Sequence, residues 1–336
     1  MILVTGGTGL LGATLLHQLL SNGEEVRAIY RHEDSIKKTL QYFKSVNSEA
    51  LFLQINWVRA DVTDCPALEK AFKDISHVYH CAALISFNPK DEELLRKINI
   101  EGTANLVNMS LEFGVTKFCY VSSIAALGDT VKIGELIDEE SEWNPDKHHS
   151  DYAISKYGAE LEVWRGTQEG LDAIIVNPGI IFGNGVFKDG SQEFFTKINK
   201  GFPFYTKGIA AIIGVKDVAK SMIYLMKSSV INERFILVAE NISYHDLMNE
   251  IALKLQKKPP TLQAGTLATS IAWRIDFIIS LLTTKKRSFT RSLAKASHSI
   301  YYYDNNKAKK ELNFTFNSTS EVLTQALSLW QPSSNH

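Results

Sequence analysis

A glycine-rich turn near the start of the chain constrains the fold more than any other stretch. The segment 5–12, Thr-Gly-Gly-Thr-Gly-Leu-Leu-Gly, directly follows the apolar run 2–4. Leucines then recur at the three- and four-residue spacing of a helix face, so the pattern predicts a buried strand, a turn and a helix. Glycines in such a turn permit a tight bend and close approach of the backbone to a pyrophosphate. The N-terminus of the helix offers free N–H groups and a partial positive charge to phosphates.

The residues expected to form this phosphate site are Thr5, Gly6, Gly9, Leu10, Leu11 and Gly12. An ordinary strand-to-helix turn carries the same local pattern, so the assignment depends on the rest of the chain. Strand-like runs follow at 25–30, 56–61, 77–83, 117–122 and 171–176, and helical patterns, among them 35–53 and 104–113, separate them. This alternation predicts an α/β fold with a Rossmann-type, doubly wound parallel sheet and right-handed crossovers.

The chain is expected to divide into two domains. Residues 1–177 and about 213–239 would form the NAD(P)-binding Rossmann domain, and about 178–212 and 240–330 a smaller, discontinuous substrate domain. The cleft between them would hold the substrate. Residues 267–282 predict a packed helix rather than a membrane span, because charges interrupt the run and a span needs about 20 apolar residues. Its apolar face, suited to the core or to a partner in a homodimer, comprises Trp273, Phe277, Ile278 and Leu281.

Composition excludes several classes of protein. The 336 residues are 45% hydrophobic and 22% charged, as in an ordinary globular chain. A net charge of -1 with both signs interspersed gives no basic field for nucleic acid or an anionic membrane. The first strand begins at residue 2, which leaves no room for a signal peptide. Cys65, Cys81 and Cys119 have no paired metal spacing, so we expect reduced cysteines, no metal site and a cytoplasmic protein.

The end of the second predicted strand bears on the choice of cofactor. An acidic residue about 20 positions beyond the glycines would bond the ribose hydroxyls of NAD. Here Tyr30 occupies that place and Arg31 follows it. A guanidinium makes charge-assisted hydrogen bonds with a 2′-phosphate, so Arg31 favours NADP over NAD. The alternative is that Arg31 is a solvated loop residue and that Glu33 or Asp34 reaches the ribose.

Other candidate residues lie just beyond the carboxyl ends of strands, where open parallel sheets bind their ligands. Asp61 would receive the adenine amino group, whereas Asp64 is better placed to cap the next helix. Small residues after the fourth strand would let its backbone approach the cofactor; these are Cys81, Ala82 and Ala83.

A serine, a tyrosine and a lysine form the candidate catalytic group. Ser123 ends the fifth strand, and Tyr152 and Lys156 lie four residues apart on one face of a predicted helix. A nearby ammonium favours the phenolate and so lowers the pKa of a tyrosine from about 10. During reduction, Tyr152 would donate a proton to a carbonyl oxygen that Ser123 holds by a hydrogen bond. A tyrosine and lysine at this spacing are common in structural helices, so their place among the other motifs carries the inference.

Together these motifs resemble the extended short-chain dehydrogenase/reductase family, of NAD-dependent epimerase/dehydratase type. The resemblance covers nearly the whole chain. Its motifs here are the glycine segment 5–12, Asp61, His80–Ala83, Asn99–Thr103, Val121–Gly128, Tyr152 with Lys156, Asn177–Gly183, Val215–Ala219 and Tyr303–Ala308. The family includes NADP-dependent ketone and aldehyde reductases and nucleotide-sugar epimerases, so the resemblance implies a nicotinamide cofactor.

The resemblance also implies roles for individual residues. Ser123, Tyr152 and Lys156 would be catalytic, and Ser122 and Lys156 would contact the nicotinamide ribose. Asn99 would support the active-site backbone or a proton relay, although it could equally cap a helix beginning at Ile100. Further cofactor contacts are expected from Val62, Tyr152, Pro178, Gly179 and Ile181, and substrate contacts from Leu84, Ser86, Phe87, Ser123 and Phe182.

Within this family the residues favour a reductase. Nucleotide-sugar 4,6-dehydratases carry Thr-Asp-Glu where this chain has the segment 123–125, Ser-Ile-Ala. Arg31 argues against epimerases that retain NAD. Within the family, the chain most resembles the dihydroflavonol reductase and 3-beta-hydroxysteroid dehydrogenase branch. Its aromatic segments predict an apolar or aromatic carbonyl substrate; the alternative is that these aromatic residues only pack in the hydrophobic core. The alternatives are a nucleotide-sugar epimerase of the same family and a non-catalytic NADP-binding redox sensor.

Overall fold

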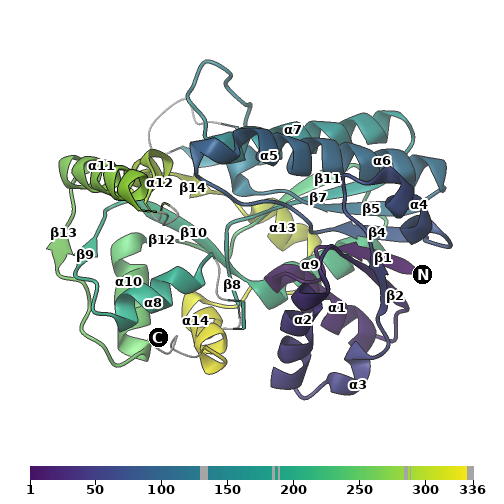
Figure 1. Cartoon of the computed structure of the whole chain (residues 1–336), viewed down its shortest axis with the longest axis horizontal. Coiled ribbons are helices and arrows are strands. Elements are labelled where there is room, and N and C mark those ends of the chain that lie inside the picture. Colours follow the sequence, from purple (N-terminus) through teal and green to yellow (C-terminus); the bar gives the residue numbers. More distant parts are fainter. Residues whose placement is uncertain (129–134, 184–185, 188–189, 284–286, 288, 331–336) are drawn as a thin grey trace.

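The main layer of the protein is a seven-stranded parallel sheet with the order β11-β7-β5-β4-β1-β2-β3 (Figure 1). The structure, a computed structural model, describes residues 1–128, 135–183, 186–187, 190–283, 287 and 289–330. The strand order reverses beside β1, which lies between β2 and β4. Ligands of doubly wound sheets bind at this reversal. The predicted Rossmann-type fold is therefore confirmed, and the glycine turn lies at the switch point.

The strands of this sheet are β1 (Ile2–Thr5), β2 (Val26–Tyr30), β3 (Asn56–Arg59), β4 (His77–His80), β5 (Lys117–Val121), β7 (Ala173–Pro178) and β11 (Glu233–Leu237). The other strands are β6 (Leu136–Ile137), β8 (Ile180–Phe182), β9 (Phe204–Tyr205), β10 (Ile209–Gly214), β12 (Glu240–Ser243), β13 (Leu262–Gln263) and β14 (Tyr302–Tyr303). The helices of the first half are α1 (Leu10–Ser21), α2 (Glu33–Ser45), α3 (Glu49–Phe52), α4 (Cys65–Phe72), η1 (Pro89–Asp91), α5 (Glu92–Leu95), η2 (Arg96–Glu101), α6 (Gly102–Glu112), η3 (Ile124–Ala126) and α7 (Asp151–Gln168). Those of the second half are α8 (Gln192–Asn199), α9 (Val215–Lys227), α10 (Tyr244–Lys254), α11 (Thr266–Leu282), α12 (Arg291–Ala296), α13 (Asn306–Glu311) and α14 (Thr319–Ser328).

Helices cover both faces of the main sheet because successive strand residues point to opposite sides. Ile2 and Val4 of β1 belong to a core formed with α1, α2 and α9, whereas Leu3 between them belongs to a core formed with α4, α6 and α7. The apolar residues of the strands are thus buried on both faces, as expected for a parallel sheet.

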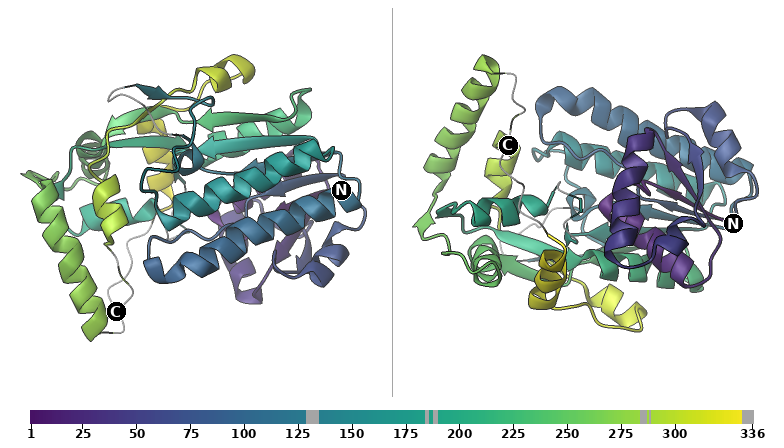
Figure 2. Two further views of the ribbon diagram at one scale, coloured as in Figure 1. Left: turned by 90° about the horizontal axis from the view of Figure 1, so that it is seen from above. Right: turned by 60° about the horizontal axis from the view of Figure 1, so that its bottom comes forward.

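A second, smaller sheet lies beyond the carboxyl edge of the main sheet (Figures 1 and 2). It has the order β12-β10-β8, in which β10 pairs parallel to β8 and antiparallel to β12. A separate core made with α8, α10 and α14 supports it. The predicted domain boundary at residue 212 falls inside β10, all of which belongs to this second sheet.

Two elements differ from the sequence prediction. The edge strand β11, not predicted from sequence, begins with two charged residues, Glu233 and Arg234, and its apolar part is short. The helix predicted over 35–53 is two helices, α2 and α3, because Asn47 adopts φ +54° between them. Asparagine tolerates this left-handed conformation better than most residues, and it ends α2.

Helix α11 has the predicted extent but not the predicted packing. Phe277, Ile278 and Leu281 of its proposed apolar face are exposed to solvent, so the expectation that this face packs in the core is wrong, while a partner in a homodimer stays a prediction. In both views of Figure 2 the helix runs along the outer edge of the smaller part of the molecule. Among the described residues, no helix is long and apolar enough to cross a membrane.

Candidate active site at the carboxyl edge of the main sheet

The glycine turn joins β1 to α1 with very little free space. Gly6 adopts φ +70°, and a Cβ there would lie 2.7 Å from the backbone nitrogen of Ala82. A Cβ on Gly12 would lie 2.1 Å from the carbonyl oxygen of Gly6. These two glycines allow strand, turn and helix to pack together. Gly9 differs, since a Cβ there would meet only Gly6 within 4 Å, at an ordinary 3.4 Å.

The start of α1 fits a phosphate group. Gly9 is the N-cap residue and provides no side-chain cap, and the first turn contains no acidic residue. The first intrahelical hydrogen bond runs from the N–H of Ala13 to the carbonyl of Gly9. The N–H groups of Leu10, Leu11 and Gly12 therefore lie at the open end of the helix, where they can donate to an anion. A dinucleotide's pyrophosphate suits this end of α1.

A buried chain of hydrogen bonds ties β1 to β4 and to the helix that follows. Thr5 Oγ1 lies 2.7 Å from His80 Nδ1, and His80 Nε2 lies 3.0 Å from Thr103 Oγ1. Thr103 donates its hydroxyl proton to the carbonyl of Asn99 at 2.6 Å, so His80 must donate from Nε2. Burial lowers the pKa of His80 to about 3, which keeps the ring neutral. Sequence reasoning quoted His80 within a motif but gave it no role.

Asn99 lies inside a continuous helical segment from α5 through η2 to α6, so the expectation that it caps a helix is wrong. Its Oδ1 accepts the N–H of Leu84 at 2.7 Å, and its Nδ2 donates to the carbonyl of Leu84 at 3.0 Å and to Ser155 Oγ at 2.9 Å. The six-residue segment η2 is a π-helix, a local irregularity that often accompanies functional sites. Asn99 thereby fixes the loop after β4 against helix α7.

The predicted catalytic side chains meet between β5 and α7. The side chain of Ser123 lies close enough to the hydroxyl of Tyr152 to influence its pKa, and the centre of the Phe87 ring lies 5.6 Å from that of the Tyr152 ring. Burial raises the pKa of Tyr152, and the interaction with Ser123 opposes that rise. Lys156 donates to the carbonyl of Val121 at 2.6 Å, and its Nζ lies 4.5 Å from the centre of the Tyr120 ring.

The electrostatics of this group differ from the sequence expectation. Lys156 was expected to lower the pKa of Tyr152, but burial dominates and raises it, so the neutral phenol prevails at neutral pH. Burial also lowers the pKa of Lys156 to about 7, while the charge of Glu160 acts in the opposite direction. The structure thus holds a protonated tyrosine beside a lysine that titrates near neutrality.

Glu160 is a functional candidate that sequence reasoning missed. Its carboxylate is buried and accepts hydrogen bonds from Ser122 Oγ at 2.7 Å and from Asn177 Nδ2 at 3.0 Å. The guanidinium of Arg234 on β11 pairs with its other oxygen at 3.0 Å. Glu160 follows Lys156 by four residues on one helix face, and this spacing is the signal that could have identified it.

Ser122 and Ser123 point to opposite sides because successive residues of an extended chain alternate. Ser123 meets Tyr152, whereas Ser122 directs its hydroxyl to the buried carboxylate of Glu160. The predicted contact of Ser122 with a nicotinamide ribose stays a prediction.

Arg31 and Asp61 lie beside each other beyond the ends of β2 and β3. Arg31 NH1 lies 3.8 Å from Asp61 Oδ2, and both side chains are solvent-accessible. Asp61 also accepts from the backbone and hydroxyl of Thr63 at 3.0 and 2.9 Å. A long, exposed ion pair of this kind is weak, so the Arg31 guanidinium can exchange the carboxylate for another anion. Asp64 accepts from the N–H of Ala67 and caps α4, as predicted.

The remaining predicted contacts fall into two groups. Segments 81–84 and 178–181 follow the carboxyl ends of β4 and β7, and Phe87 and Ser86 follow the first of them. Ser86 donates to Asp91 at 2.6 Å. Phe182, predicted to touch the substrate, is instead fully buried against Phe195 in the core of the second sheet. Val62 is buried too, and its Cγ2 lies where a Cβ on Gly102 would be.

A hollow of about 570 Å³ lies on another side of α7 from the catalytic group. Its α7 residues include Tyr157, Glu160 and Leu161 but not Tyr152 or Lys156, and Arg234 lines its far wall. The buried Glu160–Arg234 pair therefore separates this hollow from the lysine. Active-site geometry points to the carboxyl edge of the sheet, where the glycine turn and Tyr152 lie.

Comparisons with known proteins agree with this geometry. Residues 2–236 match the family described as "NAD dependent epimerase/dehydratase family". The chain is 30% identical to "Putative dihydroflavonol 4-reductase" of Synechocystis sp., over 98% of this chain and 94% of that protein. It is 26% identical to UDP-glucose 4-epimerase of Vibrio cholerae, over 78% of this chain and 77% of that one.

Solved structures agree as well. The crystal structure of gox2253 superposes on this structure with a TM-score of 0.82 at 28% sequence identity. The superposition covers 98% of this chain and 97% of the gox2253 chain. Vestitone reductase from alfalfa (Medicago sativa) superposes with a TM-score of 0.72 at 19% identity, over 98% of this chain and 97% of that one, which shows a shared fold. The chain therefore belongs to the NAD-dependent epimerase/dehydratase family, whose members are NAD(P)-dependent oxidoreductases and epimerases acting on CH–OH groups.

Proposed function

We propose that the protein is an NADP-dependent reductase that interconverts a ketone or aldehyde and an alcohol on an apolar or aromatic small molecule. The observation that carries this proposal is the side chain of Ser123 beside the hydroxyl of Tyr152, with Lys156 one helical turn away on α7. Relatives named as reductases, including anthocyanidin reductase of Arabidopsis thaliana at 24% identity, support a reductase. The ring of Phe87 beside Tyr152 favours an apolar substrate.

When bound, the nicotinamide cofactor supplies the hydride that reduces the carbonyl carbon. Tyr152 donates its phenolic proton to the carbonyl oxygen, and Ser123 holds that oxygen by a hydrogen bond. Burial favours the neutral phenol, which is the form that can donate. Protonated Lys156 stabilises the phenolate left behind. The backbone N–H groups at the start of α1 and the Arg31 guanidinium bind and orient the dinucleotide.

Replacement of the proton donor tests the activity. Wild-type protein and Tyr152→Phe are assayed for NADPH consumption with a panel of ketones, aldehydes and a nucleotide sugar. We expect turnover of an apolar carbonyl compound and a loss of about 10²- to 10⁴-fold in Tyr152→Phe. Tyr157→Phe is the matched control, since Tyr157 lies on the same helix and stacks on Trp143 away from the group. Equal turnover by wild type and Tyr152→Phe would contradict the proposed mechanism, and turnover of the nucleotide sugar alone would favour the epimerase.

Replacement of Arg31 tests the preference for NADP. The affinities for NADPH and NADH are measured before and after Arg31→Ala. Loss of charge-assisted hydrogen bonds to the 2′-phosphate should lower the NADPH affinity about tenfold and leave the NADH affinity unchanged. An unchanged ratio of the NADPH and NADH affinities would contradict the assignment of Arg31 to the 2′-phosphate.

A further inference from the structure

Helix α11 is amphipathic, but its polar side contacts the protein and its apolar side faces solvent, which is the reverse of a helix packed on a core. Two of its polar residues face the protein: Thr269 is buried and its Oγ1 lies 2.8 Å from His298 Nε2, and Asp276 pairs with Arg287 at 3.5 Å, with both side chains mostly buried. The helix packs against α12 on this side. The protein therefore holds α11 by its polar face.

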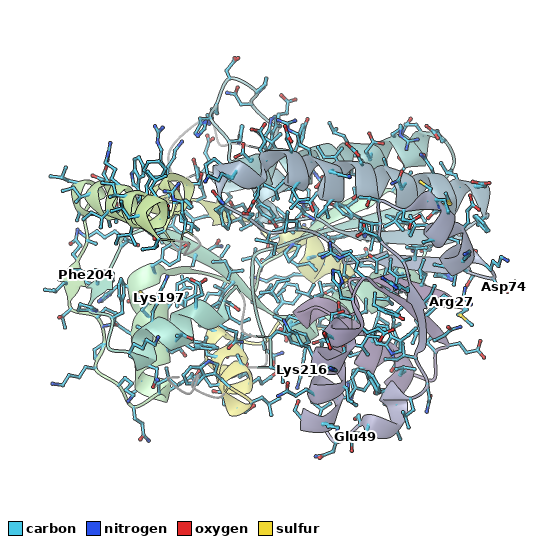
Figure 3. The ribbon with its side chains drawn as sticks, viewed as in Figure 1. Arg27, Glu49, Asp74, Lys197, Phe204 and Lys216 are labelled. Atoms are coloured by element: carbon cyan, nitrogen blue, oxygen red, sulfur yellow. The ribbon has the colours of Figure 1, made fainter. Side chains whose placement is uncertain are left out.

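The apolar side chains of α11 face solvent. They recur at spacings of three and four residues, which places them along one stripe. The stripe, which we call the apolar stripe, comprises Leu267, Ile271, Ile275, Ile278, Ile279 and Leu282. Each is about half exposed or more, from 49% for Ile279 to 81% for Leu282. Nearby strands β9 and β13 expose Phe204 and Leu262, and Phe204 lies at the outer edge of the molecule (Figure 3). Exposed apolar side chains gathered along one face of a helix are typical of an interaction site.

The chain around the apolar stripe is strongly basic. Residues 254–300 contain nine lysines and arginines but a single acidic residue, Asp276, which is paired with Arg287. Arg274, Arg291 and Lys295 are exposed, while Lys285 and Lys286 of the same run lie outside the described residues. The net charge of -1 for the whole chain hides this segment. The composition of the whole chain therefore missed a segment of the sequence that is strongly basic.

We propose that α11 lies in the plane of an anionic lipid bilayer surface, with the apolar stripe inserted between headgroups and the surrounding basic side chains paired with lipid phosphates. An apolar face flanked by lysine and arginine is the arrangement that binds such interfaces. A second copy of the chain fits less well, because a symmetric pair of α11 helices would bring two basic segments together. Because protein contacts hold the polar face of α11, the helix contributes one face and stays in the interface. This inference does not depend on the proposed reductase activity.

Vesicle binding by the full-length protein tests the inference. Co-sedimentation is measured with vesicles of phosphatidylcholine alone and with vesicles that also contain phosphatidylglycerol. We expect binding to the anionic vesicles, weakened by added salt. The triple variant Ile271→Asn, Ile275→Asn, Ile278→Asn removes the centre of the stripe and should bind at least about tenfold more weakly. These side chains are already exposed, so the variant should keep the wild-type melting temperature.

Two further variants separate the causes. Arg291→Glu with Lys295→Glu should also weaken binding to anionic vesicles, since both side chains are exposed on α12. Leu253→Asn is the matched control, because Leu253 is a 77% exposed apolar residue on α10, outside the stripe. It should bind like wild type. The inference is overturned if wild type ignores anionic vesicles, if the triple variant binds them equally well, or if wild type is a dimer that the triple variant converts to a monomer.

Discussion

Lys156 is subject to two opposing electrostatic effects. Burial removes its ammonium group from water and lowers its pKa to about 7, whereas the buried carboxylate of Glu160 favours the charged form. The charge of Lys156 thus changes within the physiological pH range. Ser122, Asn177 and Arg234 hold Glu160 in place, so residues on three different elements help to set the charge of one lysine.

Glu160→Gln tests this arrangement through the pH dependence of activity. Loss of the negative charge removes the effect that raises the pKa of Lys156, so that pKa falls further. In the proposed mechanism the protonated lysine stabilises the Tyr152 phenolate, so the alkaline limb of the kcat/KM profile should move to lower pH. The measurement is kcat/KM for the reduction over a range of pH.

Glu162→Gln is the control on the same helix, since Glu162 pairs with Arg165 and should leave the profile unchanged. A Glu160→Gln profile identical in shape to wild type would show that Glu160 has a structural role only.

At the scale of the element, the strand–turn–helix unit of β1 and α1 assigns separate tasks to its glycines. Gly12 has no room for a Cβ, because the carbonyl oxygen of Gly6 would lie 2.1 Å away. Gly9 has ordinary room on the protein side, at 3.4 Å from the same oxygen. Gly12 is therefore required for the fold, whereas Gly9 keeps the open end of α1 clear.

Two alanine substitutions separate these tasks. Gly12→Ala should lower the free energy of unfolding by about 2 kcal/mol or more, because the backbone of the turn must shift. Gly9→Ala should change it by less than about 1 kcal/mol and weaken dinucleotide binding at least about tenfold, because the new methyl group lies where phosphate approaches. Urea unfolding and titration of NADPH fluorescence provide the two measurements.

If Gly9→Ala bound the dinucleotide as tightly as wild type, the phosphate site would lie elsewhere. Equal stability of Gly12→Ala and wild type would contradict the packing described for the turn.

At the scale of the whole molecule, a hydrogen-bonded pair formed by the buried Asp217 and the half-buried Asn317 joins the two parts of the protein. Asp217 near the start of α9 accepts the backbone N–H of Asn317 at 2.9 Å and its side-chain Nδ2 at 2.7 Å. Asn317 directly precedes the N-cap of α14, a helix in the core of the second sheet. Burial raises the pKa of Asp217, and the bonds from Asn317 oppose that rise. This pair fixes α14 against the main sheet.

A double-mutant cycle measures the strength of the link. Asp217→Ala and Asn317→Ala should each lower the free energy of unfolding by about 1 to 3 kcal/mol, because the first removes both acceptors of Asn317 and the second removes the side-chain hydrogen bond to the buried Asp217 carboxylate. The double variant should be less destabilised than the sum by about 1 kcal/mol. Asp146→Ala, on an exposed loop, is the control and should change stability by less than about 0.5 kcal/mol. Strict additivity would mean that the two residues act independently.

Several features of the fold and of the candidate site were predictable because they are local. The apolar runs and glycine spacing predict β1, the turn and α1, and the tyrosine–lysine spacing predicts one face of α7. Strands β1, β5 and β7 were predicted because each is a run of mainly apolar, buried residues, whereas β2, β3 and β4 were predicted from shorter apolar stretches between helical patterns. Strand β11 was not predicted because its two charged residues interrupt the apolar pattern of the sequence. Its strand conformation depends on parallel pairing with β7 in the folded sheet.

The sequence by itself determined the alternation of strands and helices, the glycine turn and the residues brought to the sheet edge, because periodicity and turn chemistry act over a few neighbours. Only the tertiary structure decided that Ser122 faces Glu160, that burial raises the pKa of Tyr152 and that α11 turns its apolar stripe to solvent. Each of these depends on which distant segment covers a side chain. Periodicity defines a face, but the partner that packs against the face sets its burial and its electrostatic environment.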